Sequence, residues 1–578
     1  MMNRASHPLQ IGNLLLDRKT VLLAGYLALD WRAIVGRVAS LGFSLELGFY
    51  IALFAILTTG LLAAAYIPAR WPRLAVAVLC GAASVTLHGY EWTTASPLTY
   101  SAFETMLASR GDAGDALAQH AFDMARAVGA AALLFAAISL PPRSKNLPLG
   151  LHWMLPLFAF VLLLSILYVR GGEGSRALPA PYTPLAHAAI KLGLHIAVHD
   201  GPRRPVTLAP DGNATAGDIV LIVDESIAPT YLDINHPAGA YSGLAQEVDG
   251  LQIANFGIAA ALTNCSAGSN KSMRFGGTRA NFRDKAQRGP SVWAYASKAG
   301  YRTVYLDGQR MNGVLQNLAD EAERAEIDDF VQLGGDVAVV DRDHALARLL
   351  SERLANDIRE FIYVNKVGAH FPVADKFPLH AARYLPIPER GLYRTIIDMG
   401  PVHGSHRGTA AEWRLYRNAY RNTLEWNTGG FFDHLLPRAA DSGAVMIYTA
   451  DHGQDLHERG NPGKGTHCTN APQPEEGAVP LVVIDQAGMG RHDWLASARA
   501  VKDGASQSRI FPTLLALMGY GAHDTRTGYG PSLQEPVRER LAFTTDWFAM
   551  LGKEPTWRPI DPGSLAVPDP ADHLPLAD

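Results

Sequence analysis

Four long apolar stretches lie in the first 170 residues, and they restrict what this chain can fold into more than any other feature. They are residues 43–67, 74–88, 124–140 and 151–169, all rich in Leu, Ala, Val and Phe, the second being the shortest. An α-helix needs roughly 20 apolar residues to cross the hydrocarbon core of a bilayer. A soluble helical bundle rarely contains four such uniform segments in a row, so we predict a membrane domain over residues 1–170.

The N-terminal residues leave the number of membrane spans at four or five. Thr20–Leu29 is apolar but only about half a bilayer long, and Asp30 and Arg32 follow it at once. This pattern predicts either an interfacial helix or a fifth span, over residues 20–38, that tolerates a charge pair. We favour five spans.

The charges of the loops predict how the spans are oriented. Basic residues mark the cytoplasmic loops, and the longer acidic loop 91–119 then faces outward. The segment after Val169 lies outside as well. With five spans the N-terminus lies inside, and with four it lies outside. The basic residues are Arg70, Arg73, Arg143 and Lys145, and the acidic residues are Glu104, Asp112 and Asp115.

The remainder of the chain has ordinary globular composition and predicts an α/β domain. We predict a linker over residues 171–213, because they contain several prolines and a segment, 186–193, that resembles an amphipathic helix on a membrane surface. Strand-like runs then alternate with helix-like stretches at 291–299, 344–358 and 411–435, which indicates a parallel sheet covered on both faces. We place this domain at 214–553 and an irregular, proline-rich tail at 554–578. The strand-like runs are Ile219–Val223, Thr303–Leu306, Phe361–Val364, Val445–Thr449 and Pro480–Ile484.

Bulk composition excludes several classes of protein. The formal net charge is -4 over 578 residues and no basic tract is present, so nucleic acid is not an expected partner. The 3 cysteines are too few for a scaffold stapled by disulfides. Cys80 lies in a predicted membrane span and is expected to be inert packing.

One predicted strand, Val445–Thr449, leads into the sequence Asp451-His452-Gly453. Open α/β sheets bind ligands at the carboxyl ends of their strands, and glycine lets the chain turn away sharply there. A carboxylate and an imidazole are suitable zinc ligands. The same three residues also fit a plain turn in which Asp451 caps a helix and His452 is solvated, so the motif needs support from elsewhere.

Three further segments can meet this pair at the same edge of the sheet. Glu225 follows the first predicted strand, and His370 follows the third. Between them, residues 262–273 form a turn rich in hydroxyls ahead of a predicted helix, whose N-terminus would favour an anionic phosphoryl group. Each segment alone fits a loop or a solvated side chain. Together they predict a zinc site whose hydroxyl ligand is nucleophilic near neutral pH.

This ordered set of residues resembles the lipid A phosphoethanolamine transferases, which belong to the sulfatase-like branch of the alkaline phosphatase superfamily. The resemblance implies a helical transmembrane domain of four or five helices, followed by an alkaline-phosphatase/sulfatase-like α/β domain with a largely parallel central sheet. Residues 510–515 also look like the C-terminal helix of that superfamily. The set consists of Glu225, the segment 265–272, His370, Asp451-His452-Gly453 and His467.

The resemblance assigns roles to these residues. Glu225, Asp451 and His452 would be zinc ligands. The family motif Cys-Gly-Thr-x-Thr-x-x-Ser has its nucleophile at the second Thr. When the motif is aligned on Cys265, Ser269 becomes the nucleophile and a metal ligand, Ser272 matches the trailing serine, and Ser266 is the alternative.

Three more residues complete the predicted site. His370 and His467 match histidines that would bind the phosphate or a second metal, so one or two Zn²⁺ ions are expected, and one histidine could protonate the leaving group. Lys271, two residues beyond Ser269, either neutralises a phosphate or is a solvated lysine at a helix start.

The chain also departs from the family pattern. Asp224-Glu225-Ser226 stands where the family has Gly-Glu-Thr, and Ile227 stands where an arginine usually follows. The multiple periplasmic disulfides of the family are missing. Only Cys265 and Cys468 could pair, and that bond would tie the nucleophile turn to the loop that carries His467.

The function that the resemblance implies is a zinc-dependent transferase of the bacterial inner membrane, multi-pass, with its catalytic domain in the periplasm. Its serine would attack a phospholipid, with phosphatidylethanolamine as the expected donor, release diacylglycerol, and pass the head group to a lipid or glycan acceptor. Phosphoglycerol transfer, hydrolysis of phosphate or sulfate esters, and a non-catalytic envelope role are the alternatives. The sulfatase-type Cys/Ser-x-Pro-x-Arg motif is absent, because the segment 265–269 lacks both Pro and Arg.

Overall fold

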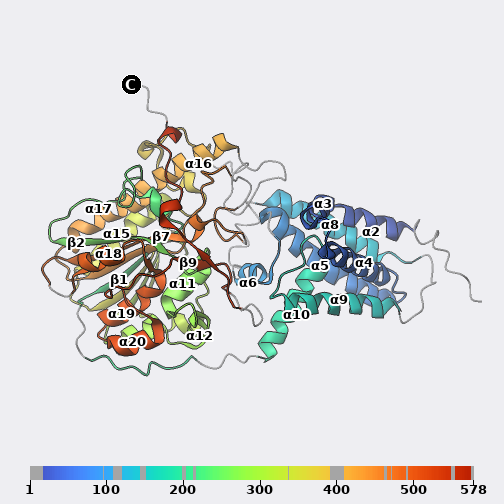
Figure 1. Cartoon of the computed structure of the whole chain (residues 1–578), viewed down its shortest axis with the longest axis horizontal. Helices are drawn as coiled ribbons and strands as arrows, with labels where there is room; N and C mark the ends of the chain where they lie inside the picture. Colours follow the sequence, from blue (N-terminus) through green and yellow to red (C-terminus); the bar gives the residue numbers. More distant parts are fainter. Residues whose placement is uncertain are drawn as a thin grey trace, which may run out of the picture. The chain divides into compact units, whose positions relative to one another are not determined.

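The chain divides into two compact units, residues 1–199 and residues 200–549 with 554–578, each with its own hydrophobic core (Figure 1). The computed structural model describes residues 17–94, 97–108, 120–142, 151–197, 203–211, 216–335, 337–390, 409–460, 465–469, 471–489, 492–547 and 554–573. The predictions made for Asp112, Asp115, Arg143 and Lys145, and the predicted domain start at 214, lie outside the described residues.

The first unit is a helical bundle that matches the predicted membrane domain. Within its described residues, 4 helices are long and apolar enough to cross a membrane: α4 (Leu45–Ala65), α5 (Arg70–Thr94), α8 (Ala121–Ser139) and α9 (Leu151–Val169). Each coincides with one of the four apolar stretches. Helix α4 packs against α9, and α5 packs against α8.

The predicted fifth span is divided into two short helices, α2 (Arg18–Ala28) and α3 (Trp31–Leu41), of 11 residues each. Neither reaches the length that a span requires. The division falls at Asp30, whose Oδ2 lies 3.0 Å from His88 Nε2 of α5. Asp30 thus pairs with a buried histidine at the position where a single long helix would have continued.

Helix α2 nevertheless runs along the bundle. Near its start, Lys19 Nζ donates to the carbonyl of Ile138 at 2.9 Å, at the end of α8. Near its end, the hydroxyl of Tyr26 lies 2.9 Å from Ser84 Oγ of α5. The helix therefore extends from one end of α8 to the later turns of α5.

Two further helices belong to this unit, α6 (Tyr100–Ala108) and α10 (Tyr182–Ala197). The predicted amphipathic helix at 186–193 lies within α10. Its apolar residues Tyr182, Ala186 and Ile190 are buried, and α10 packs against α9 and α5. This helix is therefore part of the bundle core and not a separate linker element.

The second unit is built on an eight-stranded sheet with the order β4-β3-β5-β1-β6-β7-β2-β8. All five predicted runs lie within strands β1, β3, β5, β6 and β7. The first five strands of this order, β4, β3, β5, β1 and β6, are mutually parallel. Strand β7 is antiparallel to both of its neighbours, β6 and β2. The strands are β1 (Ile219–Asp224), β2 (Leu251–Ala260), β3 (Arg302–Asp307), β4 (Asp329–Gln332), β5 (Glu360–Asn365), β6 (Val445–Ala450), β7 (Ala478–Gln486) and β8 (Ala505–Ser506).

The register of the central strands brings three chain segments to one edge of the sheet. Asp224 of β1 is paired with Ala450 of β6, and Val223 is paired with Asn365 of β5. Because the three strands are parallel and end level with one another, the residues that follow them lie side by side. This edge is where open α/β sheets place their ligands.

Helices cover both faces of the sheet (Figure 1). Helices α11 (Ser266–Phe275), α13 (Val292–Lys298) and α19 (Ile510–Leu517) pack together on one side, and α15 (Arg342–Leu354) and α17 (Gly430–Ala439) pack together on the other. The predicted helix 411–435 consists of α16 (Ala410–Thr423), a π-helical turn, η6 (Leu424–Gly429), and the start of α17. The remaining helices are α12 (Phe282–Arg288), α14 (Glu321–Arg324), α18 (Trp494–Val501) and α20 (Ala522–Tyr529).

The tail differs from the irregular segment that the sequence predicts. Strand β10 (Trp557–Pro559) pairs with β9 (Ala542–Thr544) in a small antiparallel sheet. Ile560 and Leu565 bury their side chains in an adjoining apolar cluster. Prolines limit regular structure here, but these apolar residues have a surface on which to pack.

Candidate metal centre

Glu225, Asp451 and His452 form a buried cluster at the carboxyl ends of β1 and β6. Their potential ligand atoms all lie within 4.8 Å of one another, and they are the one group of this kind found among the described residues. His452 Nε2 lies 3.4 Å from Glu225 Oε1 and 3.7 Å from Asp451 Oδ2. Two carboxylates and an imidazole therefore face a common point.

Backbone contacts orient the imidazole. His452 Nδ1 lies 2.8 Å from the carbonyl of Gly453, which can only accept, so Nδ1 carries the proton and Nε2 faces the carboxylates. Gly453 lies so close to β7 that a Cβ would come within 2.1 Å of the carbonyl oxygen of Ala478. The sharp turn that the sequence predicts after Asp451 thus needs a glycine.

One carboxylate oxygen of the cluster accepts no hydrogen bond. Asp451 Oδ1 accepts from the backbone N–H groups of Ser226 at 3.0 Å and His452 at 2.8 Å. Asp451 Oδ2 is buried without a hydrogen bond. Because buried polar atoms almost always have a partner, this orphaned oxygen fits a group that the protein itself does not supply, such as a cation.

The charges in the cluster shift one another's ionisation. Burial and the neighbouring Glu225 raise the pKa of Asp451 to about 7. Burial alone would lower the pKa of His452, but Asp451 and Glu225 raise it to about 9. Burial would raise the pKa of Glu225, but its hydrogen bond with His452 and the nearby histidines bring it well below the usual range. The cluster thus favours a retained proton, and a bound cation would compete with that proton for the same ligand atoms.

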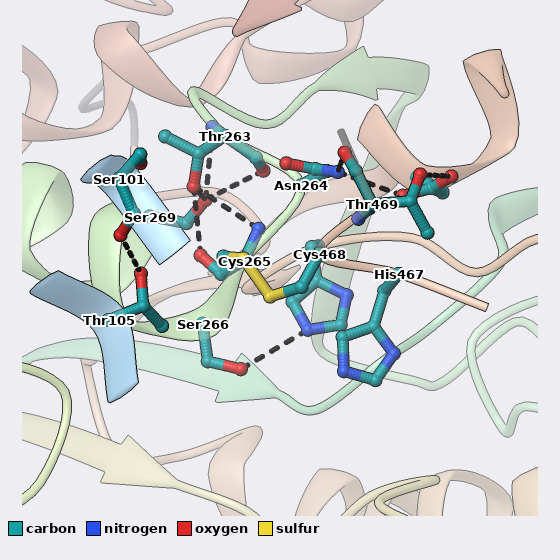
Figure 2. The surroundings of a disulfide bond; sticks show 12 residues. Ser101, Thr105, Thr263, Asn264, Cys265, Ser266, Ser269, His467, Cys468 and Thr469 are labelled. Atoms are coloured by element: carbon teal, nitrogen blue, oxygen red, sulfur yellow. Dashed lines mark hydrogen bonds between the residues drawn. A yellow bond between two sulfur atoms is a disulfide. The ribbon is translucent and has the colours of Figure 1, made fainter. Parts of the chain in front are cut away.

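Ser266 is the hydroxyl that touches this cluster. Its Oγ donates to Glu225 Oε1 at 3.1 Å and lies 3.2 Å from His452 Nε2. Ser266 is the first residue of α11, so unpaired backbone N–H groups and the positive end of the helix dipole lie beside it. In Figure 2 its hydroxyl points toward the imidazole ring.

Ser269, the nucleophile predicted by aligning the motif on Cys265, makes different contacts. Its Oγ donates to the carbonyl of Thr263 at 3.0 Å, accepts from the Thr263 N–H at 3.2 Å, and lies 3.1 Å from Thr263 Oγ1 (Figure 2). The side chain is fully buried. All of its contacts close the turn before α11, and none of them reaches the metal cluster.

The family motif fits this chain in a second register. Its nucleophile and trailing serine are three residues apart, and this spacing is met both by Ser269 with Ser272 and by Ser266 with Ser269. In the structure Ser272 donates its hydroxyl to the carbonyl of Ser269 at 2.7 Å, within the helix. Only the second register places a hydroxyl at the cluster.

A disulfide joins Cys265 to Cys468, as the sequence comparison suggested (Figure 2). The two segments are also held by hydrogen bonds. The N–H of Cys468 donates to the carbonyl of Asn264 at 2.8 Å. Glu476 accepts from Asn264 Nδ2 at 2.8 Å and from the Thr469 hydroxyl at 2.6 Å. The turn before α11 is thus fixed to the loop that carries His467.

Both predicted phosphate-binding histidines lie near the cluster. The ring of His467 stacks on the ring of His452, with centroids 4.4 Å apart. Burial and the neighbouring His452 lower the pKa of His467 well below its usual range, so its ring is neutral. His370 is exposed, and its charge helps to lower the pKa of Glu225. Its Nδ1 lies 2.7 Å from the carbonyl oxygen of Phe371, so Nε2 is the ring nitrogen that does not make this contact.

Lys271 lies away from the cluster. Its Nζ donates to the carbonyl of Leu318 at 2.9 Å and lies 5.2 Å from the centroid of the Phe275 ring. Burial lowers the pKa of Lys271 to about 8. These contacts fit neither a solvated lysine nor a direct contact with the metal ligands.

Sequence reasoning missed two residues of the site. Gln309 Nε2 donates to Glu225 Oε2 at 3.1 Å, and Ser226 Oγ donates to Glu225 Oε1 at 3.0 Å. Gln309 follows β3, which was predicted, so its place at the ligand edge of the sheet was the signal that could have identified it. Ser226 adjoins Glu225 and has a φ of 61°, which turns the chain at the end of β1.

The donor set of this cluster fits zinc. Carboxylate oxygen and imidazole nitrogen are common zinc ligands, and a fourth position is taken by water or substrate in catalytic sites. Ser266 Oγ is placed at such a position, and the orphaned Asp451 Oδ2 gives a cation a reason to bind. The protein thus combines a helical unit that has four potential membrane spans with an α/β domain that carries this cluster at its strand ends, which is the class of fold predicted from the sequence.

Comparison with known proteins agrees with this class. Residues 257–520 match the family model described as Sulfatase, so the chain contains a sulfatase-family domain. No curated protein sequence matches the chain significantly.

A solved structure shares the fold across both units. The integral membrane protein lipooligosaccharide phosphoethanolamine transferase A from Neisseria meningitidis matches with a TM-score of 0.63 and 15% identity, over 88% of this chain and 96% of that chain. The C-terminal periplasmic domain of EcEptC from Escherichia coli, in complex with Zn, matches with a TM-score of 0.48 and 14% identity, over 64% of this chain and 100% of that chain. The match to the integral membrane protein confirms the fold class predicted from the sequence.

Proposed function

We propose that this chain is a membrane-anchored, zinc-dependent transferase that moves phosphoethanolamine from a phospholipid to an envelope lipid or glycan. The observation that carries the proposal is the position of Ser266 Oγ, within hydrogen-bond reach of both Glu225 and His452. Placing a hydroxyl among metal ligands and at a helix N-terminus suits attack on a phosphoryl group.

Glu225, Asp451 and His452 would hold one Zn²⁺, with Ser266 beside it. When bound, the ion supplies Lewis-acid activation of a hydroxyl and stabilises developing negative charge. The protein orients the set through backbone contacts to His452 and Asp451. His370 and His467 would bind the phosphoryl oxygens or a second ion.

Transfer would proceed in two balanced displacements. Ser266 Oγ forms a bond to phosphorus while the bond to the diacylglycerol oxygen breaks, and its proton leaves along the hydrogen bond to Glu225. A histidine of the site protonates the departing diacylglycerol oxygen. The acceptor hydroxyl then attacks phosphorus and returns a proton to that histidine, while the bond between phosphorus and Ser266 Oγ breaks and Oγ recovers its proton from Glu225.

The membrane unit supports a lipid donor. An enzyme whose donor is a phospholipid gains from being held at the bilayer, and four helices of this chain are suited to spanning it. The membrane protein of the same fold is named a lipooligosaccharide phosphoethanolamine transferase, which favours phosphatidylethanolamine as the donor here. We place the chain in a bacterial inner membrane, as a multi-pass protein with its second unit in the periplasm.

The proposal is tested by intact-mass measurement of the full-length chain in detergent micelles with Zn²⁺ and phosphatidylethanolamine. In the absence of acceptor, the wild type should gain the mass of one phosphoethanolamine group, mapped to the peptide with Ser266. Ser266→Ala should gain none. Ser269→Ala is the matched control, because it also removes a serine hydroxyl from α11, but one whose hydrogen bonds do not reach the cluster.

Each other outcome has a defined meaning. An adduct lost in Ser269→Ala but kept in Ser266→Ala would restore the nucleophile that alignment on Cys265 predicts. An adduct formed only from phosphatidylglycerol would make the chain a phosphoglycerol transferase. Release of head group without an adduct in any variant would indicate a hydrolase. No adduct and no bound zinc would indicate a non-catalytic envelope protein.

A further inference from the structure

A fully buried cluster of three charged residues lies beside the proposed metal centre. Lys366 Nζ lies 2.6 Å from Asp224 Oδ2 and 3.6 Å from Asp343 Oδ2, and none of the three side chains is exposed. Desolvating such charges costs free energy that their attraction offsets only in part. A buried network of this kind is weak evidence for stability, and here it holds neighbouring backbone in place.

The network fixes the two turns that carry ligand-edge residues. Asp224 Oδ1 accepts from the N–H of Glu225 at 3.1 Å. Asp343 of α15 accepts from the N–H groups of Val367 at 2.8 Å and Gly368 at 2.9 Å, where the chain leaves β5. The two carboxylates thus orient backbone on both sides of Lys366, in the manner of outer-shell groups that orient metal ligands.

The two turns also contact each other directly. Gln309 Nε2 donates to the carbonyl of Lys366 at 2.7 Å and to Glu225 Oε2 at 3.1 Å. The N–H of Ala369 donates to the carbonyl of Glu225 at 3.0 Å. Gly368 has a φ of 53°, and a Cβ there would lie 2.2 Å from Asp224 Oδ1, so the turns are in close contact. A shift of Lys366 would therefore be transmitted to Glu225.

The π-helical turn η6 completes the network from the opposite side. The carbonyl of Asn427 accepts from Lys366 Nζ at 3.2 Å, and Asn427 Nδ2 donates to the carbonyl of Gly368 at 2.7 Å. Thr428 Oγ1 donates to Asp224 Oδ2 at 3.0 Å. Single π turns within α-helices are frequent at functional sites, and this one directs two consecutive residues into the network.

Asp224 directly precedes Glu225, so its charge lies beside a proposed metal ligand. A carboxylate introduced beside a metal ligand needs a compensating cation in a buried site. We propose that Lys366, paired with Asp224 and Asp343, is a positioning residue that holds Glu225 in its metal-binding orientation. Its effect on turnover rests on the proposed transferase function, but its effect on metal affinity does not.

The test compares variants of the full-length chain in detergent. Lys366→Met keeps the length of the side chain and removes the charge. We expect at least about 10-fold weaker Zn²⁺ binding in chelator competition, the range seen when outer-shell partners are removed. Asp224→Asn/Lys366→Met, which removes the charge and one of the two carboxylates left unpaired, should recover at least half of that loss on a logarithmic scale.

Arg274→Met is the matched control. Arg274 is a buried cation of the same unit, paired with buried Glu323, and none of its hydrogen bonds reaches the metal cluster. It should lower the unfolding temperature of the metal-free protein as Lys366→Met does, yet leave Zn²⁺ affinity within about 2-fold of wild type. Separate measurement of unfolding with chelator present distinguishes positioning from a general loss of stability.

The outcomes separate this inference from the proposed function. If Lys366→Met binds Zn²⁺ as tightly as Arg274→Met does, the network is merely structural and the inference is wrong. If the wild type binds Zn²⁺ but forms no phosphoethanolamine adduct, the proposed transferase is wrong, and the affinities of the variants still decide the role of Lys366. If the wild type binds no Zn²⁺, both are wrong.

Discussion

Asp451 offers the cluster a buried carboxylate oxygen that accepts no hydrogen bond. Its other oxygen is held by two backbone N–H groups, so the side chain cannot turn to find a partner. Burying an unpaired carboxylate oxygen costs free energy. A fixed, unsatisfied oxygen beside an imidazole nitrogen is what a bound cation would stabilise.

Replacing Asp451 by Asn should therefore abolish tight zinc binding. The amide keeps the shape of the side chain but removes the charge, and we expect at least a ~100-fold loss of Zn²⁺ affinity, measured by chelator competition and elemental analysis. Asp218→Asn is the control, since Asp218 is another buried carboxylate, next to the opposite end of β1. Equal zinc content in both variants would contradict the assignment of Asp451 as a ligand.

Asp218 itself predicts a pH dependence of stability. Burial and the neighbouring Glu360 raise its pKa from 3.8 to about 6. Between these values the folded chain binds a proton that the unfolded chain has released, so the contribution of Asp218 to stability is present below pH 3.8 and is lost as the pH rises to about 6.

Comparing wild type with Asp218→Asn isolates this contribution. The difference in unfolding free energy should fall by roughly 1 kcal/mol from about pH 4 to about pH 7 and then stay level, which is less than the ~3 kcal/mol of the full shift because solvent screening weakens it. Thermal unfolding at a series of pH values measures it. A difference that rises over this range would contradict the raised pKa.

At the scale of the element, the turn before α11 and the loop before β7 are fixed to each other twice. The Cys265–Cys468 disulfide joins them covalently. Glu476 accepts hydrogen bonds from Asn264 of the turn and from Thr469 of the loop. The disulfide closes a segment of 203 residues, so it restricts the unfolded chain strongly. The hydrogen bonds remain when the disulfide is removed.

The double variant Cys265→Ser/Cys468→Ser should accordingly stay folded but lose stability. We expect a loss of about 2–4 kcal/mol, with the far-UV circular dichroism spectrum unchanged. Adding Glu476→Gln should lower the unfolding temperature further and reduce transfer activity, because the turn before α11 is then held by neither device. Cys80→Ala, which removes the buried free thiol, is the control. An unfolded double variant would contradict the role given to Glu476.

The elements that could be predicted from sequence are those with a strong apolar pattern. Strands β1, β3, β5, β6 and β7 are nearly continuous runs of buried side chains. Strand β2 was missed because Asn255 and Gly257 interrupt it at an irregularity in pairing, and β4 and β8 because they have only 4 and 2 residues. Tertiary pairing, not local pattern, forms these strands.

In the candidate site, too, some residues could be predicted from local sequence pattern and others depend on tertiary contacts. Strand ends brought Glu225, Asp451 and His452 together as the sequence suggests, since register alone decides it. The choice between Ser266 and Ser269 depends on which face of one helical turn points to the cluster, and two equally spaced serines satisfy the motif. Lys366 gave no signal, because its partners Asp224 and Asp343 are 142 and 23 residues away in sequence.

At the scale of the whole molecule, hydrogen bonds within the first unit indicate which helix ends lie on the same side of the membrane. Arg73 Nε donates to the carbonyl of Ser139 at 3.3 Å, which places the end of α8 near the loop between α4 and α5. Lys19 reaches the carbonyl of Ile138 at the same end. The start of α2 therefore lies on the side of the basic α4–α5 loop, although α2 is short.

Cysteine accessibility in cells tests this arrangement. In a Cys80→Ala background, whose remaining cysteines form the disulfide, we expect Arg18→Cys and Ala69→Cys to react with a membrane-impermeant maleimide only after permeabilisation. Glu173→Cys, beyond α9, should react in spheroplasts with intact inner membranes. All three positions are exposed, so access depends on the membrane and not on burial.

Because basic loops stay in the cytoplasm, labelling of Ala69→Cys in intact spheroplasts would reverse the orientation and place the metal centre on the cytoplasmic side, away from the periplasmic acceptors. Labelling of Arg18→Cys alone would keep the orientation but contradict the placement of the start of α2 beside the end of α8.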